Sequence, residues 1–270
     1  MAELDGKTAL ITGGTTGLGL ETARRFLAEG ARVVFTGRTE SYGRAAEDEL
    51  RMLGDATYVR ADAADPAQVE ASVGEAVELL GGLDILMNNA GVGAVAGVLD
   101  TPLDVYDAIM GVNVRGSFLY AKAAFRHLEA RGGCMIHVAS DAGVRGEVEI
   151  SIYSVSKAAV VMLSDMLAIE GGRRGVRSNA ICPGDTAPGM RHMAVPGHEE
   201  REDDVSEWPI PPIGRIGRAR DVSDAAVFLA SDRASFVNGV ALLIDGGMRA
   251  GMRTETWPTG STGAQRSTSG

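Results

Sequence analysis

A glycine-rich loop close to the start of the chain constrains its fold more than any other stretch. Residues 13–19 read Gly-Gly-Thr-Thr-Gly-Leu-Gly; they follow a short apolar run at residues 8–12 and precede apolar residues at helical spacing over residues 20–29. Glycines at such a strand-to-helix turn let the backbone approach a pyrophosphate, which the amino terminus of the helix attracts. The loop therefore predicts a nucleotide-binding β-α unit, and a glycine-rich turn without a ligand is the simpler alternative.

Short apolar runs alternate with amphipathic segments along the rest of the chain. Strands that alternate with helices in this way pair in parallel, because each helix carries the chain back across the sheet. We therefore expect an α/β fold, a three-layer Rossmann-type doubly wound parallel sheet of about seven strands, in a single domain. The predicted strands are residues 8–12, 31–36, 56–60, 83–87, 133–139, 175–181 and 241–245, and the predicted helices are residues 20–29, 41–53, 66–80, 102–110, 114–130, 151–170 and 222–230.

Composition narrows the classes of partner. The chain has 270 residues and a formal net charge of −10, which argues against nucleic acid or an anionic membrane as the main partner. Cys134 and Cys182 lie in apolar runs without a Cys-x-x-Cys spacing, so we expect reduced thiols in a cytoplasmic protein. We expect no targeting segment and no membrane span. The histidines show no metal-binding spacing, so no metal is expected.

A tyrosine and a lysine four residues apart point to acid–base chemistry. Tyr153 and Lys157 lie in the predicted helix at residues 151–170, where this spacing puts both side chains on one face. A free phenol has a pKa of about 10, and a neighbouring ammonium group lowers it. Such a pair exchanges a proton with a carbonyl or alcohol oxygen near neutral pH. The same spacing also arises by chance on surface helices, so its weight depends on the motifs around it.

Three motifs, in this order, resemble those of the short-chain dehydrogenases/reductases. They are the loop Thr-Gly-x-x-x-Gly-x-Gly, the tetrad Asn-Asn-Ala-Gly at residues 88–91, and Tyr153-x-x-x-Lys157. The resemblance extends over residues 5–250 and implies an NAD(P)-dependent oxidoreductase that transfers a hydride between a nicotinamide cofactor and a ketone or secondary alcohol. Two alternatives remain: an epimerase or dehydratase of the same fold that oxidises its substrate transiently, and a non-catalytic nucleotide-binding protein.

The resemblance also implies roles for four side chains. Tyr153 is implied to be the acid/base, and Lys157 to lower the pKa of that tyrosine and to bind the nicotinamide ribose. Ser140, thirteen residues before the tyrosine, is implied to position the substrate oxygen. Asn113 is implied to kink its helix and to hold a water that relays protons to the lysine, and the alternative for this asparagine is a plain helix cap.

The end of the second predicted strand favours NADP(H). An acidic residue there binds a ribose 2′-hydroxyl, whereas an arginine suits a 2′-phosphate. The chain has Gly37-Arg38 and no acid, although NAD(H) remains an alternative if Arg38 is a solvated loop residue. Asp62 is implied to approach the adenine, or else it is a turn or cap residue. Cofactor contacts are implied for Gly13, Thr15, Thr16, Gly17, Leu18, Gly19, Arg38, Asp62, Ala63, Asn89, Ala90, Gly91, Tyr153, Lys157, Pro183, Gly184 and Thr186.

Two stretches are expected to line the substrate pocket. They are residues 144–150, between the predicted serine and tyrosine, and residues 186–193, after the sixth strand. Polar side chains in both indicate a polar, hydroxylated ketone or alcohol as the substrate. These side chains are Arg145, Glu147, Glu149 and His192.

The remaining predictions concern domain organisation and assembly. Residues 1–252 are expected to form the domain, in which residues 190–213 carry an acidic stretch and several prolines. This composition predicts a lid over the substrate or a mobile polar insertion. Residues 253–270 are rich in Thr, Ser and Gly and predict a flexible polar tail. The family resemblance implies a homotetramer or homodimer formed through helices at residues 114–130 and 151–170.

Overall fold

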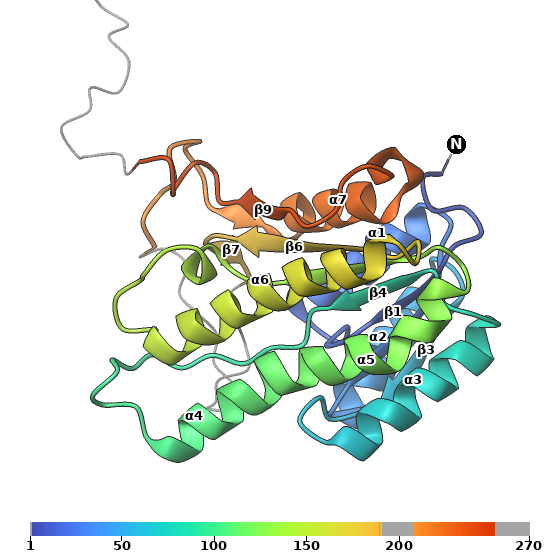
Figure 1. The fold of residues 1–270 in the computed structure, drawn as a ribbon, viewed down its shortest axis with the longest axis horizontal. Coiled ribbons are helices and arrows are strands. Elements are labelled where there is room, and N and C mark those ends of the chain that lie inside the picture. The colour runs from blue at the N-terminus through green and yellow to red at the C-terminus, as the bar shows by residue number, and fades with distance from the viewer. Residues whose placement is uncertain (1, 189, 191–207, 252–270) are drawn as a thin grey trace, which may run out of the picture.

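Seven parallel strands form the centre of the fold, as the alternating pattern predicts (Figure 1). The computed structural model describes residues 2–188, 190 and 208–251. The predicted tail at residues 253–270 and residues 191–207 of the predicted lid lie outside the described residues. The strands are β1 (Thr8–Ile11), β2 (Arg32–Gly37), β3 (Ala56–Arg60), β4 (Ile85–Asn88), β5 (Cys134–Val138), β6 (Arg177–Pro183) and β9 (Ala241–Ile244).

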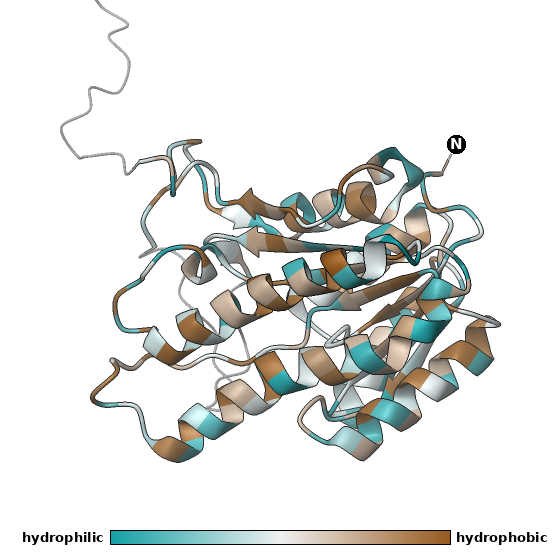
Figure 2. Ribbon diagram, viewed as in Figure 1, coloured by the Kyte–Doolittle hydropathy of each residue, from teal (hydrophilic) through white to brown (hydrophobic). Residues whose placement is uncertain are grey.

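Side chains alternate between the two faces of the sheet and are buried on both. Ala9 and Ile11 of β1 belong to one apolar core cluster and Leu10 belongs to the other. One set of helices (α1, α2 and α7) covers the first face, and another set (α3, α5 and α6) covers the second (Figures 1 and 2). These helices are α1 (Gly17–Ala28), α2 (Glu40–Arg51), α3 (Pro66–Leu80), α5 (Ser117–Glu129), α6 (Ser151–Gly172) and α7 (Ala219–Ala230); short 3₁₀ turns are η2 (Asp141–Gly143) and η4 (Asp232–Ala234).

The order of the strands reverses between β1 and β4, and this reversal places the site. The spatial order is β3-β2-β1-β4-β5-β6-β9, and every neighbouring pair is parallel. The loops after β1 and β4 therefore diverge at the carboxyl ends of the strands, where open α/β sheets bind ligands. The glycine-rich loop follows β1, and the tetrad at residues 88–91 begins at the last residue of β4.

Two predicted helices are one continuous helical run in the structure. The helix α4 (Leu103–Ile109) passes directly into a π-helical segment, η1 (Met110–Gly116), and this segment passes into α5. The interruption predicted near Asn113 is therefore a π-helical segment rather than a break. Such segments add a residue to the helical turn and change the direction in which its side chains project.

Other differences from the predicted elements have local causes. The helix α7 begins at Ala219 rather than at residue 222, because the backbone N–H of Arg218 donates to the Asp221 carboxylate at 2.7 Å and caps the helix. Two strands were not predicted, since each has only two residues and leaves no alternating pattern. These strands, β7 (Thr186–Ala187) and β8 (Gly217–Arg218), pair in parallel as a small second sheet.

One described helix, α6, is long enough and apolar enough to cross a membrane by length and composition, with a mean hydropathy of 1.5. The sequence alone predicted no apolar stretch of this length. The helix packs along β6, and its polar side chains Lys157 and Ser164 are buried inside the protein. Among the described residues it is the one helix that meets this criterion.

Candidate active site

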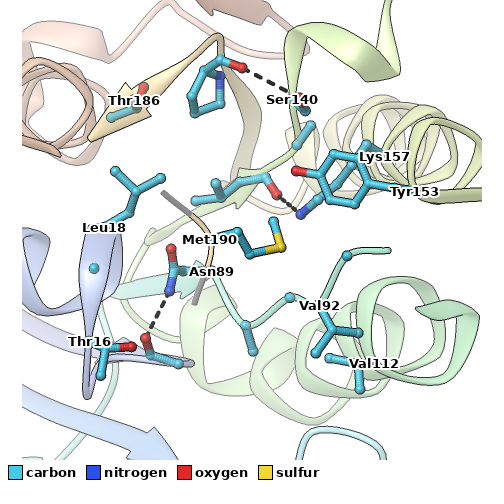
Figure 3. Close-up of a pocket in the computed structure, with 18 of the residues that line it drawn as sticks. Thr16, Leu18, Asn89, Val92, Val112, Ser140, Tyr153, Lys157, Thr186 and Met190 are labelled. Carbon is cyan, nitrogen blue, oxygen red and sulfur yellow. Dashed lines mark hydrogen bonds between the residues drawn. The ribbon is translucent and has the colours of Figure 1, made fainter. Parts of the chain in front are cut away.

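A cavity of about 690 Å³ opens at the carboxyl ends of the strands. Loops that follow β1 to β6 form its walls, so it lies in the crevice that the strand order creates. Figure 3 shows labelled residues of the walls that follow β1, β4, β5 and β6. The catalytic and cofactor-contacting residues predicted from the sequence line this cavity, with two exceptions. Gly19 and Asn113 do not line it.

The glycine-rich loop and the tetrad are joined by the side chains of Thr12 and Asn89. Thr12 Oγ1 accepts hydrogen bonds from the backbone N–H groups of Asn89 and Ala90, both at 3.0 Å. Asn89 Nδ2 donates to the carbonyl oxygens of Thr12 and Gly13, again at 3.0 Å. The two loops that flank the point of strand reversal therefore form one rigid wall of the cavity.

The amino terminus of α1 offers uncapped N–H groups to the cavity. Thr16 is the N-cap residue but makes no side-chain cap hydrogen bond, and the first turn contains no acidic residue. Gly13 (φ 64°) and Gly17 (φ 55°) have left-handed backbone angles, which glycine adopts without strain. An anion would meet free amide dipoles here with no side chain in its way, so this loop fits a pyrophosphate.

Arg38 lines the same cavity at the end of β2, where its side chain is exposed. The guanidinium group makes no hydrogen bond or ion pair within the described part of the chain. Its backbone carbonyl accepts a hydrogen bond from Arg60 Nε at 3.2 Å. A Cβ atom on Gly37 would lie 2.5 Å from Thr15 Cγ2, so a larger residue at position 37 would displace Thr15. The site therefore presents an unpaired arginine directly after a glycine, at which any side chain would require Thr15 to move.

Asp62 is a turn residue, as one of its two predicted alternatives states, and its contact with the adenine stays a prediction. The residue lines the cavity after β3. Its Oδ1 also accepts a hydrogen bond from the N–H of Ala64 at 2.9 Å, which holds a turn. The cap of α3 itself is Asp65, whose carboxylate accepts from the N–H groups of Ala67 and Gln68. Asp62 is thus a turn residue that faces the cavity.

Asn113 joins the cavity wall to the helix that carries Tyr153. It is buried in η1, where its Oδ1 accepts from the N–H of Val92 and its Nδ2 donates to the carbonyl of Val92, both at 2.9 Å. Nδ2 also donates to Ser156 Oγ at 3.0 Å, and this hydroxyl donates to the carbonyl of Tyr153 at 2.7 Å. The alternative of a plain helix cap is wrong, because Asn113 lies inside a helical run. The water relay stays a prediction.

Three side chains meet at one end of the cavity (Figure 3). Tyr153 lies in the first turn of α6 and points its hydroxyl toward Ser140 and the Lys157 amine. Lys157 is buried one turn later; its Nζ donates to the carbonyl of Val138 at 2.8 Å and lies 5.6 Å from the centre of the Tyr153 ring. Ser140 follows β5 and begins η2. The side-chain arrangement predicted from the spacing is therefore present.

Burial, rather than the lysine, governs the pKa of Tyr153. Burial raises this pKa above the usual phenol value, hydrogen bonding with Ser140 lowers it only in part, and the charges of Asp141 and Glu147 raise it again. Burial also lowers the pKa of Lys157 to about 8. Burial therefore outweighs any lowering of the tyrosine pKa by the ammonium group, because the two groups lose water together and the lysine holds its own proton more weakly. Tyr153 is protonated at neutral pH.

The loop after β6 closes the cavity beside this cluster. Pro183, Gly184 and Thr186 all line the cavity, as predicted. Thr186 Oγ1 donates to the carbonyl of Gly184 at 2.8 Å, so its hydroxyl stabilises its own loop. A Cβ atom on Gly184 would lie 3.0 Å from Asp245 Cα, which explains why a glycine is needed at this close approach.

The predicted substrate stretches contribute only some of their residues. In residues 144–150, Glu147 and Ile150 line the cavity; in the described part of residues 186–193, Thr186, Pro188 and Met190 do. Three other polar residues were expected to face the substrate. Arg145 instead pairs with Asp141 at 3.0 Å, Glu149 is exposed and does not line the cavity, and His192 lies outside the described residues.

Sequence reasoning missed part of the wall. Residues 92–95, Val112, Asp141, Asp185 and Trp208 also line the cavity. Residues 92–95 directly follow the tetrad and Asp141 directly follows Ser140, so adjacency to a motif was the available signal. Trp208 lies within residues 190–213, which the sequence predicted as a lid over the substrate or a mobile polar insertion, but no motif singled out this residue.

The two cysteines are free and buried, which confirms the expectation of reduced thiols. Burial raises the pKa of Cys134 and of Cys182 to about 11, so neither is a reactive thiolate at neutral pH. Within the described ranges, no group of three or more His, Cys, Asp or Glu side chains is arranged to hold a metal ion.

Known proteins with the same features include several dehydrogenases. The family described as enoyl-(acyl carrier protein) reductase matches residues 13–249. L-rhamnose 1-dehydrogenase (NAD(P)(+)) of Azotobacter vinelandii is 37% identical over 249 residues, which cover 90% of this chain and 96% of that protein. Meso-2,3-butanediol dehydrogenase of Serratia marcescens is 36% identical over 249 residues, covering 91% of this chain and 96% of that protein. The crystal structure of a dehydrogenase/reductase from Sinorhizobium meliloti 1021 matches with a TM-score of 0.82 and 35% identity, covering 91% of this chain and 96% of that chain.

A dinucleotide-sized crevice that ends at a half-buried tyrosine and a buried lysine defines a class of nicotinamide-dependent enzymes. The family match and the similar dehydrogenases identify the family within this class. The chain belongs to the short-chain dehydrogenases/reductases, and it is an NAD(P)-dependent oxidoreductase that acts on CH–OH or C=O groups.

Proposed function

We propose that the protein uses NADP(H) to interconvert a small ketone and its secondary alcohol, with Tyr153 as the acid and base. One observation carries the proposal. The Tyr153 hydroxyl, Ser140 and Lys157 meet at one end of a single cavity, and the uncapped amino terminus of α1 with Arg38 lines the other. A nicotinamide dinucleotide is long enough to join two such ends, and when bound it supplies the hydride.

The protein's own groups handle the proton and the oxygen. Tyr153 keeps its proton at neutral pH, so it donates to the substrate oxygen during reduction. During oxidation the phenol first loses its own proton, and the phenolate then accepts the proton of the alcohol. Ser140 donates a hydrogen bond to the same oxygen and orients the carbonyl. Lys157 binds a ribose hydroxyl through its amine. Asn113 holds the Val92 loop against the Tyr153 turn, so it positions the tyrosine through Ser156.

The remaining cofactor contacts follow from the walls of the cavity. We assign the pyrophosphate to the glycine-rich loop, the adenine side to Asp62 and Ala63, and the nicotinamide side to the loop after β6. The relative from Azotobacter vinelandii is named for both NAD and NADP, so the family alone does not decide the preference. The preference for NADP(H) is supported by the unpaired Arg38 and by Gly37, where an acidic side chain would displace Thr15.

Arg38→Ala is expected to raise KM for NADPH by ~10- to 100-fold, because the guanidinium group makes charge-assisted hydrogen bonds to the 2′-phosphate. KM for NADH should change little, since that cofactor has only a hydroxyl at this position. Initial rates of ketone reduction with each cofactor, for the wild type and the variant, measure both effects. The assignment of NADP(H) would be contradicted if the wild-type protein strongly preferred NADH. It would also be contradicted if the variant raised KM for both cofactors equally.

A spectroscopic assay distinguishes this oxidoreductase from an epimerase or dehydratase of the same fold. An oxidoreductase changes the near-ultraviolet absorbance of its nicotinamide in proportion to product, whereas transient oxidation leaves no net change. Relatives named for a diol and a sugar support net oxidation. We expect a stoichiometric change in absorbance with ketones or secondary alcohols as substrates.

We further propose a homodimer or homotetramer formed through the outer faces of α5 and α6. Four exposed apolar side chains lie on α6 at spacings of seven, four and three residues, so they form one stripe; they are Val155, Met162, Met166 and Ile169. Phe118 on α5 is exposed as well. The side chain of Ile169 is 72% exposed, and a stripe of this kind is covered by the same stripe of a second copy in a two-fold interface. A cytoplasmic location is also proposed, supported by the two free thiols.

Met162→Glu is expected to shift the protein from an oligomer to a monomer, because it would bury an unpaired charge in the interface. Light scattering coupled to size-exclusion chromatography measures the mass at micromolar concentration. Met52→Glu is the matched control, since Met52 is 84% exposed at the end of α2, away from the stripe. A monomeric wild-type protein, or equal masses for all three proteins, would rule out this interface.

A further inference from the structure

The backbone that carries Arg38 is held from behind by the neighbouring strand, β3. Tyr58 lies in β3 beside β2, is buried, and does not line the cavity. Its hydroxyl donates a hydrogen bond to the carbonyl oxygen of Gly37 at 2.8 Å. The next carbonyl, that of Arg38, accepts from Arg60 Nε at 3.2 Å. Side chains of one strand therefore hold the peptide groups on both sides of the Arg38 Cα atom.

Packing holds the ring of Tyr58 in one position. The ring lies against α2 at Gly43, where a Cβ atom would overlap the ring atoms. Phe35 of β2 also contacts the ring, with 5.8 Å between the ring centres. The backbone N–H of Tyr58 donates to Oε1 of the buried Glu47 at 3.1 Å. Because the ring has no room to move, its hydroxyl fixes the position of the Gly37 carbonyl.

We propose that Tyr58 is a positioning residue for cofactor selection, which holds the backbone at Arg38 so that the guanidinium group meets the 2′-phosphate of NADP(H). This inference rests on the proposed preference for NADP(H) and adds a residue behind the cavity wall that sets its strength. An arginine on a loose backbone loses conformational freedom when it binds a phosphate, and a backbone fixed in advance avoids part of this cost. The hydroxyl thus acts through Arg38 and does not touch the cofactor.

The effect of this hydroxyl on the Arg38 backbone can be separated from its effect on the fold. The Gly37 carbonyl has a second partner, because it also accepts from the backbone N–H of Ala61 at 3.2 Å. Removal of the Tyr58 hydroxyl therefore leaves this carbonyl paired, and the large cost of an unpaired buried acceptor does not arise. A phenylalanine at position 58 also keeps the ring that packs against α2.

The experiment measures Kd for NADPH and for NADH by fluorescence titration of the full-length protein without a substrate. Tyr58→Phe is expected to raise Kd for NADPH by ~3- to 10-fold, as the loss of one hydrogen bond predicts, and to leave Kd for NADH within ~2-fold of the wild-type value. The value of kcat at saturating NADPH should stay unchanged, because the cluster around Tyr153 is untouched. An NADPH affinity equal to that of the wild type would overturn the proposal.

A double-mutant cycle tests whether the hydroxyl acts through Arg38. In the Arg38→Ala protein, Tyr58→Phe should cause no further rise in Kd for NADPH, because the guanidinium group that the hydroxyl positions is absent. If the effects of the two substitutions on NADPH binding were additive instead, Tyr58 would act independently of Arg38 and the proposal would be wrong.

Tyr120→Phe is the matched control, since it also removes a buried hydroxyl beside β2. The Tyr120 hydroxyl lies 3.4 Å from that of Thr36, one residue before Gly37, and makes no contact with the Gly37 or Arg38 carbonyl. We expect this variant to keep the wild-type ratio of the Kd for NADH to the Kd for NADPH. A fall in this ratio as large as that in Tyr58→Phe would overturn the proposal, because a general loosening of β2 would then explain both.

The outcomes also separate this inference from the proposed function. If the wild type prefers NADPH and Tyr58→Phe keeps this preference in full, the role of Tyr58 is overturned and the proposed function stands. If the wild type binds NADH as tightly as NADPH, the assignment of NADP(H) and the role of Tyr58 are both overturned.

Discussion

Tyr153→Phe is expected to lower kcat by about 10²- to 10⁴-fold, the usual contribution of a positioned acid or base. The variant loses only the hydroxyl that the structure turns into the cavity beside Ser140. The ring remains, and with it the packing of the first turn of α6 and the 5.6 Å contact between the ring centre and Lys157 Nζ. Cofactor binding should therefore be nearly unchanged, because the glycine-rich loop and Arg38 are untouched.

The measurement pairs steady-state reduction of a ketone with a fluorescence titration of NADPH. Tyr106→Phe serves as the control, since Tyr106 is partly exposed on α4 and does not line the cavity. This control should keep wild-type kcat. Full activity in Tyr153→Phe would show that another group transfers the proton and would end the assignment.

The pKa of Tyr153 also determines how the rates of alcohol oxidation and ketone reduction change with pH. Burial holds this pKa above the ordinary value, so the phenol keeps its proton through neutral pH and is ready to donate it during reduction. Oxidation requires the phenol to accept a proton and therefore to lose its own first. The rate of alcohol oxidation should accordingly rise with pH above neutrality, while ketone reduction should not.

Much of the fold and of the cofactor wall could be predicted because the signals are local. A short apolar run predicts a strand that is buried on both faces, and all seven strands of the main sheet lie within predicted ranges or a few residues from them. The glycine-rich loop and the tetrad are continuous in sequence, so their residues were found. The contact between the two loops is evident only in the three-dimensional structure, where Thr12 and Asn89 exchange hydrogen bonds. The predicted lid, the tail and the domain boundary at residue 252 stay predictions.

What the sequence could not supply depends on burial and on contacts between distant loops. The spacing places Tyr153 and Lys157 on one helical face, but it carries no information about how far the two side chains are buried. Burial raises the pKa of Tyr153, which is the opposite of the expected shift. The contact between Asn113 and Ser156 spans 43 residues, and it requires the π-helical segment to aim the amide. Asp141, Glu147 and Asp185 line one cavity only because their three loops lie at one edge of the sheet.

Gly19→Ala is expected to weaken NADP(H) binding by at least ~10-fold and to lower the free energy of unfolding by about 1–3 kcal/mol, the usual cost of overpacking. Gly19 lies behind the cavity wall in the first turn of α1. A Cβ atom there would lie 2.2 Å from the carbonyl oxygen of Gly13 and 2.5 Å from Asn89 Nδ2. Both neighbours belong to the hydrogen-bonded junction of the two loops, so relief of the clash must move the wall that binds the pyrophosphate.

A glycine-to-alanine change elsewhere shows that the effect comes from the contact and not from the methyl group. Gly74 lies inside α3, and a Cβ atom there meets nothing within 4 Å. Gly74→Ala should therefore raise the free energy of unfolding by ~0.5–1 kcal/mol, because alanine loses less backbone entropy in a helix, and should leave cofactor affinity unchanged. Urea denaturation and NADPH titration of both variants give the comparison. If Gly19→Ala behaves like Gly74→Ala, the two loops do not pack as closely as the contacts around Asn89 require.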